Sequence, residues 1–97
     1  MDHKVTDNSA KKQYELLVDD KLARLEYIVA QNRIFLTHTE VPIGLEGRGI
    51  GSELIRQVLE DIQLKNMILV PLCPFVAGYI KKHPEWKSLV LKGINIA

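Results

Sequence analysis

Three glycines at alternate positions, Gly47, Gly49 and Gly51, lie between a strand-like segment and an apolar-periodic helix. Glycine permits a sharp backbone turn and removes the Cβ that would hold a ligand away. A helix that begins at Ile50 directs unpaired N–H groups and the positive end of its dipole into this loop. The segment therefore predicts an anion site, most naturally for a phosphate or a pyrophosphate.

The glycine spacing excludes two common phosphate motifs. A P-loop requires a Gly-Lys pair, and the sequence contains none. The dinucleotide fingerprint requires a third glycine where this sequence has Ser52. The alternative is a glycine-rich turn that binds nothing, since a short glycine motif has a real false-positive rate.

The sole cysteine, Cys73, precedes Pro74 and an expected helix. A helix N-terminus stabilises a thiolate, which would favour a nucleophile or a transient acyl acceptor. An inert, buried cysteine is the alternative, because free cysteine is among the most buried residue types. One cysteine forms no internal disulfide, which favours a reducing compartment, and we expect a cytoplasmic protein.

Three further side chains could transfer protons. His38 and Glu40 are two residues apart in an expected strand, so they face the same side and could accept a proton from an amine, directly or through water. A cross-strand polar contact would also explain this pair. Tyr79 offers a phenol as general acid for a thiolate leaving group, although simple packing of its ring is the alternative. The histidines and the cysteine lack zinc-ligand spacing, so no metal is expected.

Length and composition predict one domain over residues 1–97. Apolar residues make up 46% of the chain and charged residues 26%, with a net charge of +1, which gives no reason to expect nucleic acid or a membrane surface as partner. No apolar run approaches the roughly 20 residues of a membrane-spanning helix. The start lacks the apolar core of a secretory signal, and residues 1–10 are expected to be flexible.

The elements that would position these side chains begin with three strands. Residues 13–18, 22–30 and 33–41 alternate in polarity and are separated by short turns, which predicts an antiparallel meander. In the third strand the alternation puts His38 and Glu40 on the same face as the apolar Ile34 and Leu36. Pro42 ends the ladder because it has no N–H to donate.

A helix, a strand and a second helix follow. Apolar residues from Ile50 to Ile62 recur at helical spacing, and residues 67–70 predict a buried strand. Pro74 suits the first turn of a helix that continues to Lys82, whereas residues 86–90 are ambiguous. This order predicts an α/β (α+β) fold with a mixed sheet covered by helices. The loops after the third and fourth strands should then meet at neighbouring strand ends.

Three sequence blocks together resemble the minimal, single-domain members of the GNAT acetyltransferase superfamily. They are residues 38–42 (HTEVP), residues 46–52 (EGRGIGS), and residues 71–76 with 79–86 (PLCPFV and YIKKHPEW). The resemblance runs from about residue 14 to residue 90. It implies a GNAT-like sheet and the transfer of an acetyl group from acetyl-CoA to an unknown amine. The alternatives are a CoA-binding or sensing module with little turnover, and a plain interaction domain.

The resemblance also assigns roles to particular residues. The loop and helix start would hold the pyrophosphate, the preceding strand end would pair with the pantetheine, and Cys73 would stand where the thioester arrives. The implied cofactor-binding residues are Thr39, Val41, Glu46, Gly47, Arg48, Gly49, Ile50, Gly51, Ser52, Cys73 and Pro74. The resemblance implies Tyr79 as the general acid, and with the residues argued above the candidate catalytic residues are Cys73, Glu40, His38 and Tyr79.

The sequence departs from the family pattern in three respects. Glu46 replaces the usual Gln or Arg, and we expect its carboxylate to turn away from a pyrophosphate. The sequence also has no counterpart of the helices that form much of the acceptor site in longer members, which leaves the acceptor undefined. Cys73 is not shared with the larger members, which mostly transfer directly from thioester to amine, so whether it is acylated, contacts the cofactor or is structural stays open.

Overall fold

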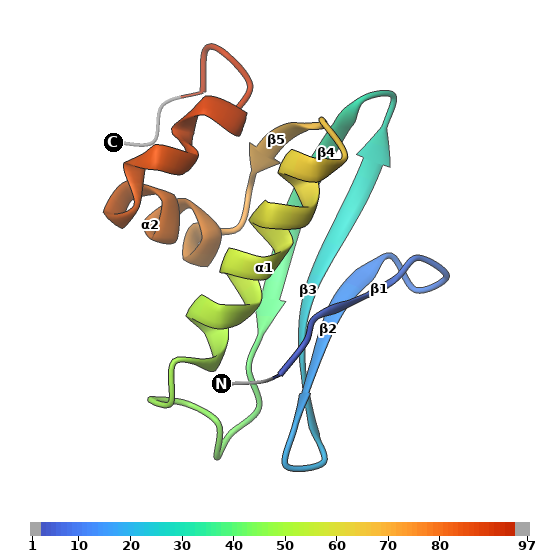
Figure 1. The fold of residues 1–97 in the computed structure, drawn as a ribbon, viewed down its shortest axis with the longest axis vertical. Helices are drawn as coiled ribbons and strands as arrows, with labels where there is room; N and C mark the ends of the chain where they lie inside the picture. The colour runs from blue at the N-terminus through green and yellow to red at the C-terminus, as the bar shows by residue number, and fades with distance from the viewer. Residues whose placement is uncertain (1–2, 95–97) are drawn as a thin grey trace.

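Five strands form one sheet in the order β1-β2-β3-β4-β5, and two helices pack against it (Figure 1). The structure, a computed structural model, describes residues 3–94. Its elements are β1 (Thr6–Asn8), β2 (Gln13–Val18), β3 (Lys21–Ala30), β4 (Arg33–Glu40), α1 (Ile50–Leu64), β5 (Ile68–Pro71), α2 (Pro74–Lys82) and the short 3-10 helix η1 (Pro84–Leu89). The predicted α+β fold with a mixed sheet is confirmed.

Strands β1 to β4 are an antiparallel meander, and α1 carries the chain over to β5, which runs parallel to β4. The β2–β3 connection has two residues, Asp19 and Asp20, with φ of 52° and 61°. Positive φ at both central residues is the geometry of a tight hairpin turn, and Asp tolerates it better than most residues. The predicted meander is therefore correct for β2, β3 and β4.

Strand β1 was missed by the sequence reading. It pairs with β2 through Asp7↔Tyr14 and its two neighbouring pairs, so part of the segment expected to be flexible belongs to the sheet. Three polar residues carry too little alternation to be recognised as a strand. The part of that expectation that concerns residues 1 and 2 lies outside the described residues. The ambiguous segment 86–90 is mostly η1.

A β-bulge in β4 corrects the predicted faces of that strand. Tyr27 pairs with Leu36 but Glu26 pairs with His38, so Thr37 is the extra residue, and its hydroxyl donates to the Glu26 carbonyl at 3.2 Å. An extra residue reverses the side on which all later side chains point. His38 and Glu40 therefore do not share the buried face of Ile34 and Leu36, as simple alternation had predicted, and Thr39 does.

The apolar core lies between one face of the sheet and the two helices. Tyr14, Leu16 and Leu25 line this face, and each is at most 2% exposed. The apolar stripe of α1, which includes Leu54, Val58 and Ile62, packs on it, as do Val76 and Ile80 of α2. This core fixes where α1 and α2 begin relative to the end of β4.

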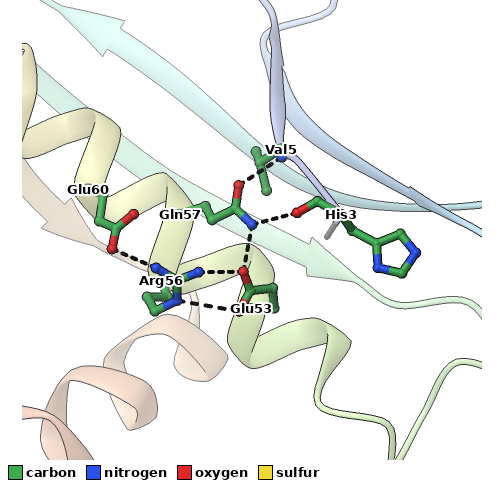
Figure 2. Close-up of polar contacts among 6 residues, drawn as sticks. All are labelled: His3, Val5, Glu53, Arg56, Gln57 and Glu60. Atoms are coloured by element: carbon green, nitrogen blue, oxygen red, sulfur yellow. Dashed lines mark hydrogen bonds and ion pairs between the residues drawn. The ribbon is translucent and has the colours of Figure 1, made fainter. Parts of the chain in front are cut away.

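The Gln57 side chain of α1 binds the backbone of the N-terminal segment at His3 and Val5, as Figure 2 shows. The Gln57 amide accepts from the Val5 N–H at 2.9 Å and donates to the His3 carbonyl at 2.9 Å. It thus satisfies one backbone donor and one backbone acceptor, as the backbone of a neighbouring strand would. The same amide donates to Glu53 at 2.6 Å. A second attachment joins β2 to α1, where the Tyr14 hydroxyl donates to Asp61 at 2.6 Å.

Gln57→Ala should lower the free energy of unfolding by about 1–2 kcal/mol, because the segment loses partners for two backbone groups. Urea unfolding measures this change, and Gln63→Ala is the matched control, since Gln63 is exposed on the same helix. Amide exchange of Val5 should accelerate in Gln57→Ala alone. Equal losses of stability in the two variants would contradict the role given to Gln57.

Candidate functional site

The loop between β4 and α1, residues 42–49, adopts a conformation that depends on glycine. Gly44, Gly47 and Gly49 have φ of 98°, 77° and 75°, in the left-handed region that other residues avoid. Leu45 is the one loop side chain in the core, at 1% exposed, and its N–H closes a turn to the Pro42 carbonyl at 3.1 Å. The loop thus leaves β4 and presents its backbone at the start of α1.

The first turn of α1 provides free donors, as the sequence predicted. The helix begins at Ile50 after Gly49, which supplies no side-chain cap. The first intrahelical bond runs from the Glu53 N–H to the Gly49 carbonyl at 3.0 Å. Within residues 3–94 no hydrogen bond uses the N–H groups of Ile50, Gly51 or Ser52. Together with the helix dipole, they form the anion-binding geometry expected at this loop.

Two adjoining cavities lie at this helix start. The first, of about 250 Å³, is lined by Val41, Leu45, Glu46, Gly47, Gly49, Ile50, Gly51, Ser52 and Phe75. The second, of about 310 Å³, is lined by Ser52, Pro74, Phe75, Gly78, Tyr79, Lys82 and His83. Ser52 and Phe75 line both cavities, so the two cavities lie next to each other between the glycine loop and α2.

Gly51 allows close packing at the start of α1. A Cβ at this position would lie 2.8 Å from Phe75 Cζ and 3.4 Å from a Val41 methyl. Without that Cβ, the first turns of α1 and α2 come together beside the end of β4. Phe75 itself is 50% exposed and borders both cavities.

Strands β4 and β5 part at the point where Cys73 begins α2. Their last pair is Leu36↔Pro71, and the Leu36 carbonyl accepts from the N–H groups of both Leu72 and Cys73, at 3.0 and 2.9 Å. Beyond it, the remainder of β4 continues without a strand on that side. Thr39 Oγ1 lies 3.2 Å from Cys73 Sγ across the gap. Cys73 is the N-terminal cap of α2 and is 5% exposed.

His38 and Glu40 lie on the opposite face of the sheet from Thr39 because of the bulge. His38 Nε2 and Glu40 Oε1 are 3.0 Å apart, and Arg24 lies 4.0 Å from the same carboxylate. The hydrogen bond from His38 lowers the pKa of Glu40, and the charge of Arg24 adds to this effect. If Glu40 accepts from Nε2–H, the His38 Nδ1 retains a lone pair that can take a proton.

Tyr79 and the basic residues of α2 complete the surroundings. Tyr79 stacks on His83 with ring centroids 4.2 Å apart, and both line the second cavity beside Lys82. Burial raises the pKa of the Tyr79 phenol, so the hydroxyl stays protonated at neutral pH. Tyr79 is therefore available as a proton donor or as a stacking surface.

The structure brings most of the predicted cofactor residues together. Val41, Glu46, Gly47, Gly49, Ile50, Gly51 and Ser52 share the first cavity, whereas Pro74 and Tyr79 share the second. Arg48 points elsewhere and pairs with Asp19 of the β2–β3 turn at 2.7 Å. The sequence did not indicate that Phe75, Lys82 and His83 line a cavity. For Phe75 the available signal was its place in α2, one residue before the buried Val76, which turns its ring away from the core.

Comparison with known proteins decides the family. The family model described as GCN5-related N-acetyl-transferase matches residues 13–89, which cover β2 to η1. The chain belongs to this acetyltransferase family. The resemblance to the GNAT superfamily is thus confirmed for the family as a whole.

The chain is also similar to two named relatives, and it shares the fold of a solved structure. The chain is 28% identical over 65 residues to Protein NATD1 of Xenopus tropicalis, covering 67% of this chain and 60% of that protein. For Protein NATD1 of Homo sapiens the identity is 29%, over 67% of this chain and 58% of the relative. The match thus spans under two thirds of these relatives. The solution structure of a GCN5-like protein from Staphylococcus aureus has the same fold, with a TM-score of 0.67, 22% identity and coverage of 95% and 90% of the two chains.

Residues 3–94 contain no group of three or more His, Cys, Asp and Glu side chains arranged to hold a metal ion. In the same part of the chain, no helix is long and apolar enough to cross a bilayer.

Proposed function

We propose that this GNAT domain is an acetyl-CoA-dependent N-acetyltransferase that acts on a primary amine. The observation that carries the proposal is the set of free N–H groups of Ile50, Gly51 and Ser52 in the family's cofactor position, at the junction of two cavities. In this proposal they hold the pyrophosphate of CoA, and Val41 and Phe75 border the path of its pantetheine arm. Acetyl-CoA supplies the acetyl group as a thioester.

The gap beyond Leu36↔Pro71 is the proposed site of acetyl transfer. The thioester would lie near the end of β4 and Cys73, where Thr39 pairs with Leu25 of β3 on one side and has no strand on the other. In this proposal the amine approaches from the face that carries His38, while the cofactor occupies the face that carries α1 and α2.

His38 is the proposed proton acceptor and Glu40 the residue that orients it. The hydrogen bond from His38 holds the pKa of Glu40 below its usual range, so the carboxylate is a weak base at neutral pH and is given the orienting role. The amine nitrogen attacks the thioester carbonyl, its proton passes to His38, and the C–S bond breaks. The protonated Tyr79 is the proposed donor to the departing thiolate.

Native mass spectrometry with acetyl-CoA tests the proposal most directly. We expect a one-to-one non-covalent complex and, with a panel of primary amines, acetylated product. Binding without transfer to any amine would favour a CoA-binding module. Failure to bind either CoA or acetyl-CoA would overturn the proposal.

Denaturing the same sample tests the role of Cys73. Because direct transfer needs no acyl-enzyme, we expect no added acetyl mass in the denatured wild-type chain, and we expect Cys73→Ala to retain acetyl-CoA binding. An acetyl group that survives denaturation in the wild type but not in Cys73→Ala would instead make Cys73 a covalent acyl carrier.

A further inference from the structure

Two side chains of the β2–β3 turn reach across to the glycine loop. Arg48 Nη1 donates to Asp19 Oδ2 at 2.7 Å, and Lys21 Nζ donates to the Ile43 carbonyl at 3.1 Å. Lys21 lies so closely on the loop that a Cβ at Gly44 would overlap its Nζ. The Arg48 contact also holds the pKa of Asp19 below its usual range. Asp19 and Lys21 thus contact the loop near both of its ends.

The loop has few other attachments that would hold it in place. Within the described residues, Leu45 supplies its one buried side chain, and Ile43, Gly47 and Gly49 are exposed. Three residues at positive φ need glycine, which loses more conformational freedom on ordering than any other residue. Such a loop would have to be ordered when an anion binds unless something orders it beforehand.

We propose that the β2–β3 turn positions the phosphate-binding loop before CoA binds, with Asp19 and Lys21 as positioning residues. This inference rests on the proposed function, because it concerns the same pyrophosphate site. Asp19 acts through the Arg48 guanidinium and Lys21 through the Ile43 carbonyl, so neither touches the cofactor. Arg48 then contributes its backbone to the loop, while its side chain serves as the tether.

The energetic effect follows from preorganisation. If the loop is already ordered in the free protein, binding removes less conformational entropy. A ligand that contacts the loop therefore binds more tightly. Exposed ion pairs are weak, so each contact should change CoA affinity only about two- to fivefold. The two contacts lie at opposite ends of the loop, and their effects should combine to about tenfold.

The test uses Asp19→Asn, Lys21→Met and the double variant, with Asp20→Asn as the matched control. Asp19 and Asp20 have nearly the same positive φ, and Asn tolerates it, so both single Asn variants keep the turn. NMR titration with CoA and with pantetheine, which lacks the pyrophosphate, gives the two dissociation constants. We expect weaker CoA binding in the three test variants, unchanged pantetheine binding, and wild-type values for Asp20→Asn.

Amide hydrogen exchange in the ligand-free protein gives a second readout that does not depend on the cofactor. Exchange at Gly47 and Gly49 should be faster in Asp19→Asn than in Asp20→Asn. Equal exchange in these two variants would overturn the inference even if CoA binds the wild type. Tighter CoA binding by Asp19→Asn would also overturn it, since Asp19 would then compete with the pyrophosphate for Arg48. If the wild type did not bind CoA, the proposed function would be refuted instead.

Discussion

Gly49→Ala is expected to weaken CoA binding about five- to thirtyfold, because a side chain in the left-handed region costs about 1–2 kcal/mol. Gly49 has a φ of 75° and immediately precedes the free N–H groups of Ile50, Gly51 and Ser52. The new Cβ meets nothing within 4 Å, so the effect is one of backbone strain and not of a clash. When the backbone relaxes to relieve that strain, the three N–H groups no longer point toward one anion position. Isothermal titration with CoA measures the change.

Gly93→Ala provides the matched control for this substitution. Gly93 has a φ of 97°, a Cβ there would also meet nothing within 4 Å, and the residue lines neither of the two cavities. Both variants should lose a similar amount of thermal stability, and only Gly49→Ala should lose affinity for CoA. If the two variants bound CoA equally well, the glycine loop would not be the pyrophosphate site.

Hydrophobic periodicity was sufficient to predict most of the framework. Buried Leu16, Leu25 and Leu54 lie on the faces that alternation or helical spacing assigned to them, because burial of a continuous apolar face determines which side of an element turns inward. The glycine spacing likewise predicted the start of α1 at Ile50. These signals come from residues that are close together in the chain, so a single sequence is sufficient to detect them.

The site depends on features for which a single sequence has no local signal. The bulge at Thr37 reverses the face of His38 and Glu40, and nothing in the alternation of β4 marks it, since Thr suits either face of a strand. The Arg48–Asp19 pair joins residues 29 positions apart, and only the packing of α1 on the sheet brings them together. The predicted pair His38–Glu40 was correct as a contact but wrong in its relation to the core.

His38→Asn is expected to lower kcat by about a hundredfold or more while binding of acetyl-CoA stays unchanged. The reason is that His38 faces away from the cofactor cavities and holds the lone pair proposed to take the amine proton. Glu40→Gln should have a smaller effect, because the amide still accepts from His38 Nε2 at the observed distance of 3.0 Å but no longer stabilises the imidazolium electrostatically. Aminolysis of acetyl-CoA by a panel of primary amines, followed through the released thiol, gives kcat and KM.

Glu15→Gln tests whether kcat depends on His38 and Glu40 in particular or on the total charge of the sheet face that carries them, the face opposite α1 and α2. Glu15 lies on β2, pairs in register with Arg24, and accepts from Asn8 at 3.0 Å, so it shares the face of His38 without contacting it. Its replacement should leave kcat within about twofold of the wild type, since removal of one partly solvated charge has little effect at a distance. A loss of kcat as large as that of His38→Asn would show that the face acts through its field on the amine, and the assignment of His38 as proton acceptor would fail.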